Sequence, residues 1–217
     1  MREPTFAELL AMPGVVEQCE LRGAFGLMAY HGGGLEEMTD VVARAVAERA
    51  GASYYGVHHP PDWTLHLSST RIDPAGSPTL AGFLDHVEVV ITIHGFGRRG
   101  YFTSLLLGGR NRDLARHVAG HLRRGLPQYE IVDDLDRIPS SLRGTHHRNP
   151  VNLPPEHGVQ IELPPRVRGG GPYWKDCDHE LVPHTVALID SLAKAVTTWQ
   201  PTRPTSTPAT GRRGSGG

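Results

Sequence analysis

The sequence has little of three features that would restrict the class of protein. Its 217 residues include two cysteines, Cys19 and Cys177, too few and too far apart for a disulfide framework or a thiolate metal site. The formal net charge is −1, and basic residues are not interleaved with aromatic ones as in many nucleic-acid-binding proteins. No apolar run approaches the ~20 residues that a membrane helix needs. We therefore expect neither nucleic-acid nor membrane partners.

The N-terminal segment also lacks the pattern of a secretion signal. Acidic residues and Pro13 interrupt the stretch in which a signal peptide has an unbroken apolar core. Hydrophobic residues make up 38% and charged residues 21% of the chain, as in ordinary soluble domains. We expect a cytoplasmic protein, which would reach the outside only through cell lysis.

The sequence does contain short apolar runs that alternate with helix-forming segments. Strands are predicted at residues 25–30, 52–57, 65–68, 87–93, 104–107, 129–132 and 158–163. Helices are predicted at residues 5–12, 40–50, 79–86, 112–125 and 182–199. The alternation predicts a single-domain α/β fold with a mixed, mostly parallel sheet covered by helices. We expect this domain at residues 21–199, after a lead-in at 1–20 and before a disordered tail at 200–217.

Three ionisable residues lie at the ends of predicted strands, where open α/β sheets bind their ligands. They are His31, His94 and Glu162, and Glu36 follows His31 by five positions across a three-glycine turn. The turn would let both side chains reach one ion. Two imidazoles and one carboxylate with an open position are typical of a hydrolytic zinc site. We predict that His31, Glu36 and His94 bind zinc, although two hydrogen-bonded strand-end histidines without a metal would fit the same spacing.

Glu162 is the candidate catalytic base. A carboxylate inside an apolar run is unfavourable unless it is paired or takes part in chemistry. Opposite a zinc-activated water it would act as general base, and then as general acid to the leaving amine. The alternative is an outward-facing strand residue, because Gln160 and Glu162 alternate with apolar neighbours.

Basic and amide side chains in the loops beyond the strand ends are candidates for substrate binding. A guanidinium group can bind a substrate carboxylate by planar two-point hydrogen bonding. We take Arg71, Arg98, Arg168 and Asn149 as the predicted substrate-binding residues and expect an acidic substrate. Most surface arginines have no such role, and Asn149 could simply shape its turn.

The motifs of the chain recur, in order, in a known family. They are HGGGLE at 31–36, SYY at 53–55, LHLSS at 65–69, IHGF at 93–96, GG at 108–109, NPVN at 149–152 and GVQIEL at 158–163. Over residues 20–195 the chain resembles the phage-type poly-γ-glutamate hydrolases and their bacterial homologues. The resemblance implies a zinc-carboxypeptidase-like fold and a γ-linked glutamate polymer as substrate.

The same resemblance implies roles for individual residues. His31, Glu36 and His94 match the zinc ligands of the family, and Glu162 matches its catalytic glutamate. Gln160 and Arg168 match recurring positions without an assigned role. Arg71 and the basic loop at 98–101 depart from the family pattern, and they suit either a polyanion or another acidic amide.

Three hypotheses for function follow. The leading one is a zinc-dependent hydrolase of γ-glutamyl amide bonds that depolymerises poly-γ-glutamate and holds one Zn²⁺ per chain. The second is a zinc deacylase or peptidase for small N-acyl amino acids or cell-wall γ-glutamyl peptides. The third is a non-catalytic protein that binds an acidic polymer, which the intact set of ionisable residues disfavours. The same ligand set could also hold iron, cobalt or manganese.

Overall fold

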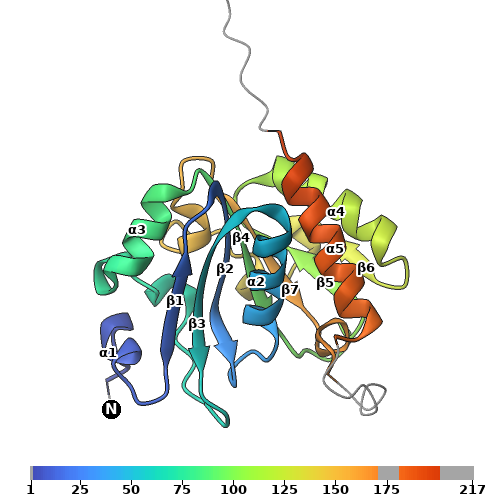
Figure 1. Ribbon diagram of the computed structural model, residues 1–217. Helices are drawn as coiled ribbons and strands as arrows, with labels where there is room; N and C mark the ends of the chain where they lie inside the picture. Colours follow the sequence, from blue (N-terminus) through green and yellow to red (C-terminus); the bar gives the residue numbers. More distant parts are fainter. Residues whose placement is uncertain (1, 171–180, 201–217) are drawn as a thin grey trace, which may run out of the picture.

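The computed structural model describes residues 2–170 and 181–200, and its centre is one seven-stranded sheet (Figure 1). The strands lie in the order β1-β3-β2-β4-β7-β5-β6. Their bounds are β1 Val16–Glu20, β2 Gly23–Gly33, β3 Ala52–His59, β4 Val89–Gly95, β5 Ser104–Leu107, β6 Glu130–Val132 and β7 Gly158–Leu163. Neighbouring strands are parallel except for the pairs β1–β3 and β5–β7. The predicted α/β fold with a mixed, mostly parallel sheet is confirmed.

Helices cover both faces of this sheet (Figure 1). They are α1 Phe6–Leu10, α2 Thr39–Ala50, α3 Pro78–His86, α4 Arg112–Gly125 and α5 Pro183–Thr198. Helices α2, α4 and α5 share the larger apolar core with Val159, Ile161 and Leu163 of β7. Helices α1 and α3 pack on the other face. Because side chains alternate along a strand, Gln160 and Glu162 point to the face opposite α2, α4 and α5.

Two local predictions were wrong. Residues 65–68 form no strand: the segment crosses the strand ends, where the Leu67 carbonyl accepts a hydrogen bond from His31 Nε2 at 2.8 Å. Residues 16–20, which we expected to be an irregular lead-in, form β1 and pair with β3. The predicted disordered tail lies outside the described residues from position 201 onward. Among the described residues, no helix is long and apolar enough to cross a membrane.

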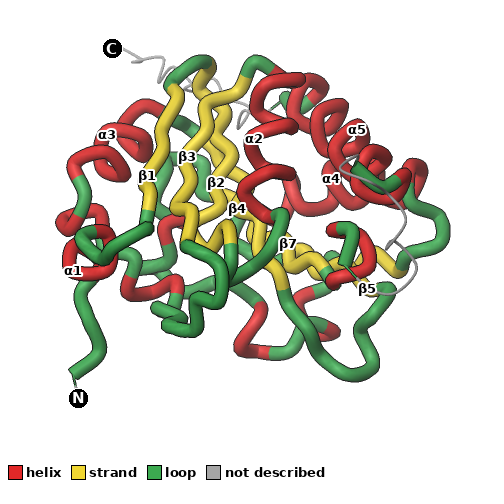
Figure 2. The backbone as a smooth tube through the Cα atoms, turned by 60° about the horizontal axis from the view of Figure 1, so that its bottom comes forward, coloured by secondary structure: helices red, strands yellow, loops and turns green. Residues whose placement is uncertain are grey.

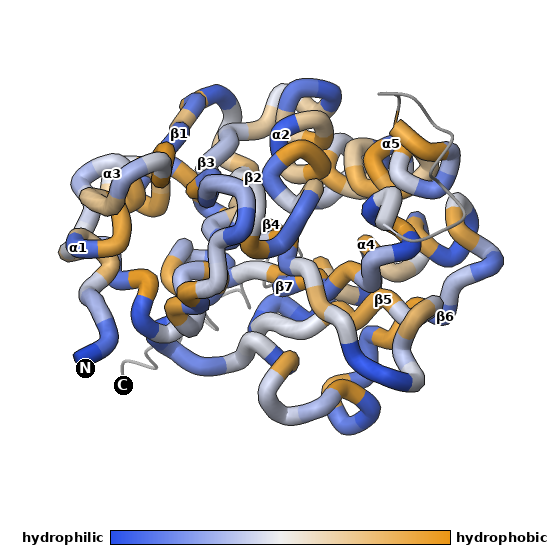
Figure 3. Tube along the Cα trace, turned by 90° about the horizontal axis from the view of Figure 1, so that it is seen from below, coloured by the Kyte–Doolittle hydropathy of each residue, from blue (hydrophilic) through white to orange (hydrophobic). Residues whose placement is uncertain are grey.

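The carboxyl ends of β2, β3, β4 and β7 meet at one edge of the sheet, because these strands are parallel. Figure 2 turns this edge toward the viewer and shows loops and short helical turns gathered below it. Seen from below, the chain is hydrophobic along the central strands and mostly hydrophilic in the loops around them (Figure 3). The edge is therefore polar at its surface and apolar beneath, and it lies where open α/β sheets bind their ligands.

Candidate metal centre and active site

The glycine turn after β2 brings Glu36 back to His31. Gly33 has a φ of +66°, and a Cβ at this position would lie 2.2 Å from the backbone oxygen of His59. A Cβ at Gly34 would lie equally close to the backbone oxygen of Pro60. The turn closes with a 2.9 Å hydrogen bond from the Glu36 N–H to the His31 carbonyl oxygen. Only glycine fits this close approach of two backbones, so the turn fixes the direction of the Glu36 side chain.

The carboxylate of Glu36 is the centre of a buried cluster. Its Oε1 lies 3.0 Å from His31 Nδ1, and its Oε2 lies 3.3 Å from His94 Nδ1. Oε2 also accepts a 2.8 Å hydrogen bond from the backbone N–H of Gly95. His31, Glu36 and His94 are at most 9% exposed. The three residues predicted as zinc ligands therefore lie together, from two neighbouring strands and one turn.

The Nε2 atoms of both imidazoles are hydrogen-bonded, and the Nδ1 atoms are therefore available to bind a metal ion. His31 Nε2 lies 2.8 Å from the Leu67 carbonyl, which only accepts, so Nε2 carries the proton. His94 Nε2 lies 3.1 Å from the Tyr30 hydroxyl, which itself donates to Asn149 Oδ1. In the neutral rings both Nδ1 atoms then present lone pairs beside Glu36. This donor set, with each outer nitrogen already bonded, fits a zinc ion or a similar divalent metal.

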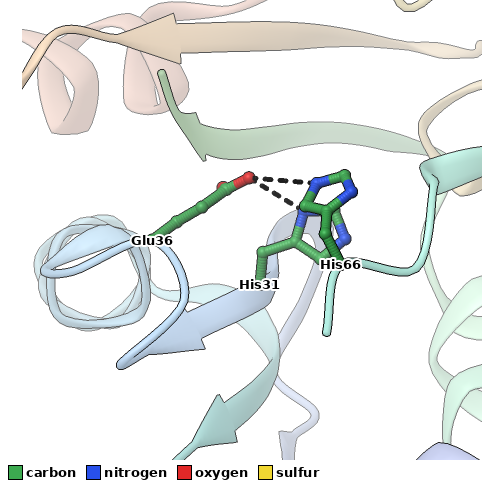
Figure 4. A group of neighbouring side chains, drawn as sticks. All are labelled: His31, Glu36 and His66. Atoms are coloured by element: carbon green, nitrogen blue, oxygen red, sulfur yellow. Dashed lines mark hydrogen bonds and ion pairs between the residues drawn. The ribbon is translucent and has the colours of Figure 1, made fainter. Parts of the chain in front are cut away.

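His66 offers a further nitrogen at the same place. Ligand atoms of His31, Glu36 and His66 all lie within 4.8 Å of one another, and Figure 4 shows the Glu36 carboxylate directed at both rings. The His66 Nε2 lies 3.8 Å from Glu36 Oε1, and its side chain is 54% exposed. His94 is 3% exposed and tied to Tyr30. His66 therefore stands at the mouth of the cluster and His94 at its base.

Glu162 lies beside the cluster on β7. The parallel register pairs it with His94, and the side chain is 4% exposed, so it is no outward-facing strand residue. Its Oε1 accepts a 2.8 Å hydrogen bond from Gln160 Nε2. Burial raises the pKa of Glu162 above its ordinary value, and the nearby His94 only partly opposes this. A carboxyl group of raised pKa is suited to exchange a proton near neutral pH.

The ionisable groups of the cluster shift one another. Burial would raise the pKa of Glu36, but His31 and His94 hold it well below its ordinary value. Burial lowers the pKa of His31, which favours the neutral, ligating imidazole. Burial would lower the pKa of His94, but Glu36 and, to a smaller extent, Glu162 together raise it above its ordinary value. A metal at this site would therefore compete with a proton on His94.

A cavity of about 500 Å³ opens over this cluster. His31, Glu36, His94 and Glu162 all line it, as does His66. Its other walls come mainly from residues 68–70 and 140–146. The metal candidates and the candidate base thus face one space that a substrate could enter.

Two of the predicted substrate-binding arginines lie near this cavity but not in it. Arg71 forms an ion pair with Glu3 and lines a neighbouring cavity of about 370 Å³. Thr70 lines both cavities, so they adjoin. Arg98 is exposed and its Nη2 lies 3.4 Å from Ser141 Oγ, on the cavity wall. Both arginines could reach a substrate that extends beyond the main cavity.

The other two predicted substrate-binding residues already have hydrogen-bond partners within the protein. Those of Arg168 are backbone carbonyls, and those of Asn149 include buried side chains. The guanidinium of Arg168 donates to the carbonyls of Leu163 and Glu37. A Cβ at Gly95 would lie 2.7 Å from its Cζ, so the group packs against the backbone at the end of β4. Asn149 lines the cavity but is 2% exposed and bonded to Tyr30 and Gln160.

The sequence from residue 11 to residue 170 matches the poly-gamma-glutamate hydrolase family. The chain belongs to this family. It is therefore an enzyme, a hydrolase. No protein of curated function matches the sequence.

Solved structures of two proteins share the fold of this hydrolase. A bacteriophage poly-gamma-glutamate hydrolase is 20% identical, with a TM-score of 0.71, over 84% of this chain and 87% of that one. YndL, in its zinc-free apo form, is also 20% identical with a TM-score of 0.71, over 85% of this chain and 90% of that one. A metallo-carboxypeptidase from Burkholderia cenocepacia is 10% identical with a TM-score of 0.47, over 87% and 65% of the two chains.

Three residues at the site of this hydrolase have no role that the sequence predicts. Tyr30 looked like the last apolar residue of its strand, and Gln160 like a polar residue between apolar ones. His66 belongs to the LHLSS motif, whose alternation predicted a strand. The polar residues inside otherwise apolar strands were the available signal, because such groups need partners when buried.

Proposed function

We propose that this hydrolase cleaves γ-glutamyl amide bonds of poly-γ-glutamate with the help of a zinc ion. The observation that carries the proposal is the convergence of two imidazoles, one carboxylate and a separate buried glutamate on one cavity. Membership of the family supports the polymer as the substrate. The zinc-free form named for YndL supports zinc as the metal.

His31, Glu36 and His94 would hold the metal. Bound zinc would supply Lewis-acid chemistry, polarising the amide carbonyl and lowering the pKa of a water molecule to about 7. Hydrogen bonds hold the two imidazoles in place: His31 Nε2 is bonded to the Leu67 carbonyl and His94 Nε2 to the Tyr30 hydroxyl. Such outer partners orient the imidazoles and make them better ligands.

Glu162 would move the proton. Its Oε1 is engaged by Gln160, whereas its Oε2 has no hydrogen-bond partner among the described residues. Oε2 would accept a proton from the attacking water and return it to the nitrogen of the leaving amine. The raised pKa of Glu162 brings the two steps closer in free energy, since base and acid roles both need a carboxyl that is neither too strong nor too weak.

The shape of the site favours an extended substrate. The main cavity and the neighbouring one share Thr70 in their linings, so an extended substrate could reach from one to the other. Arg71 and Arg148 line the far cavity, and the Arg148 guanidinium has no hydrogen-bond partner among the described residues. Free carboxylates repeat along a γ-glutamyl polymer, and guanidinium groups bind carboxylates well.

The proposal is tested with purified protein and substrates of two sizes. Poly-γ-glutamate is incubated with the protein, and its length distribution and new amine ends are measured. We expect the polymer to shorten, the reaction to stop with a chelator, and added zinc to restore it. Small N-acyl amino acids and a γ-glutamyl dipeptide are tested beside it.

Either of two results would contradict the proposal. Rapid hydrolysis of the small amides with an intact polymer would support the deacylase or peptidase hypothesis instead. Cleavage that survives complete removal of metal would refute the requirement for zinc. An Arg148→Ala variant tests the far cavity: we expect a higher KM for long polymer and an unchanged KM for the dipeptide.

A further inference from the structure

A continuous series of hydrogen bonds joins the candidate metal ligand His94 to Glu162. The Tyr30 hydroxyl lies 3.1 Å from His94 Nε2 and donates to Asn149 Oδ1 at 3.0 Å. Asn149 Nδ2 donates to Gln160 Oε1 at 2.8 Å, and Gln160 Nε2 donates to Glu162 Oε1 at 2.8 Å. All five side chains are buried, with no more than 4% exposed.

One backbone group fixes the direction of this series. The N–H of Val151, which can only donate, points at Asn149 Oδ1 at 3.3 Å. The amide of Asn149 must therefore present Oδ1 to Tyr30 and Nδ2 to Gln160. Gln160 must then accept through Oε1, which leaves its Nε2 to face Glu162. Tyr30, which donates to Asn149, is left to accept from His94.

Tyr30 has a single hydroxyl proton, and it donates this proton to Asn149 Oδ1. Every hydrogen bond of the series then runs from donor to acceptor from His94 toward Glu162. Aligned hydrogen bonds of this kind strengthen one another in a buried setting.

We propose that Tyr30, Asn149 and Gln160 are positioning residues. Their hydrogen bonds all run from donor to acceptor in the direction from His94 to Glu162, and they set the His94 tautomer at one end and hold the Glu162 carboxylate at the other. Tyr30 keeps the His94 proton on Nε2, so that Nδ1 is free for a metal. Gln160 holds Oε1 of Glu162 and leaves Oε2 toward the cavity. The role assigned to the Glu162 end rests on the proposed function, whereas the role at His94 does not.

The proposal predicts different effects at the two ends. Tyr30→Phe removes the acceptor of His94, and we expect zinc affinity to fall by about 10–100-fold, as for other outer partners of ligating histidines. Gln160→Met keeps the length of the side chain but removes both hydrogen bonds. We expect its kcat to fall by about 10–100-fold. KM and zinc affinity should change little, because the proposed zinc ligands and the arginines near the cavity are unchanged.

Asn149→Asp tests the direction itself. Its carboxylate keeps an acceptor for Tyr30 and Val151 but replaces the donor to Gln160 with a second acceptor. The Gln160 amide must then turn and present its oxygen to Glu162. We expect a lower kcat, as in Gln160→Met, with zinc affinity that is not weakened.

Thr92→Val is the matched control. Thr92 pairs with Gln160 in the sheet, and its buried hydroxyl has no hydrogen-bond partner among the described residues. The change removes one buried hydroxyl from the same face of the sheet and leaves every hydrogen bond of the series in place. We expect wild-type kcat and zinc affinity, and all variants are checked for cooperative thermal unfolding.

The His94 tautomer gives a readout that needs no substrate. In zinc-loaded protein with isotope-labelled histidine, NMR should show His94 as the Nε2–H form with a slowly exchanging proton. Tyr30→Phe should speed the exchange of that proton, and Thr92→Val should not. An Nδ1–H form of His94, or equal effects of Tyr30→Phe and Gln160→Met on zinc affinity and kcat, would overturn the proposal. Loss of polymer cleavage in the wild type would refute only the proposed function.

Discussion

At the scale of single residues, two histidines each offer a nitrogen near Glu36 as the third ligand of the proposed metal site. His94 is buried, and its Nε2 is bonded to Tyr30, so its ring is held with Nδ1 toward Glu36. His66 is half exposed, and its ring tilts over His31 with centroids 4.5 Å apart. A ligand held in place before binding loses less conformational entropy, so we propose His94 rather than His66 for this position.

A pair of alanine variants tests this assignment. We expect His94→Ala to lose stoichiometric zinc, with a fall in affinity larger than the ~10–100-fold typical of an outer partner. His66→Ala should keep its zinc and change mainly the KM, since the ring lies at the mouth of the cavity. Metal content after gel filtration measures how much zinc each variant retains. Zinc loss in His66→Ala with zinc retained in His94→Ala would assign the ligand to His66.

The sequence predicted which ionisable residues lie together better than it predicted their surroundings. His31, Glu36 and His94 come together because they follow parallel strands and a glycine turn, and these are local patterns. The burial of Glu162 could not be predicted, because alternation along β7 also fits a strand with one solvated face. The Gln160 amide that donates to Glu162 is itself held by Asn149, which lies outside the strand.

At the scale of elements, the turn between β2 and α2 decides where Glu36 lies. Gly33 combines a positive φ with a backbone oxygen 2.2 Å from any added Cβ. Gly51, after α2, has nearly the same φ of +65° but open space around it. The two glycines therefore separate the effect of backbone conformation from that of crowding.

This contrast gives a prediction for two glycine variants. Gly51→Ala should lower the free energy of unfolding by about 1 kcal/mol, through its conformation alone, and leave zinc affinity unchanged. Gly33→Ala should lower it by about 2–4 kcal/mol, because the turn must also move, and should weaken zinc binding. Thermal or denaturant unfolding and zinc titration measure the pair, and equal zinc affinity in both variants would contradict the account of the turn.

The two errors in the predicted elements have physical causes. Strand β1 is an edge strand with mixed exposure and polar residues, so its pattern carries little apolar signal. Residues 65–68 alternate like a strand, but the Leu67 carbonyl is bonded to an imidazole rather than to a neighbouring strand. Pairing with distant partners decided both cases, and no local pattern records it.

At the scale of the whole molecule, the parallel sheet places the chemistry at one edge. The carboxyl ends of β2, β4 and β7 supply His31, His94 and Glu162, and the loops supply the walls of the cavity. The larger apolar core lies under α2, α4 and α5, on the face of the sheet opposite to the Glu162 side chain. Variants of the site should therefore affect activity and metal binding more than folding.

The most direct test combines metal content and poly-γ-glutamate cleavage in one sample, with the wild type beside Glu162→Gln. Glutamine keeps the shape of the side chain and can still pair with Gln160, but it cannot take a proton. We expect stoichiometric zinc in both proteins, and a kcat lower by about 10²–10⁴-fold in the variant. A variant that cleaves the polymer at the wild-type rate, or a wild type that binds no stoichiometric metal, would contradict the account.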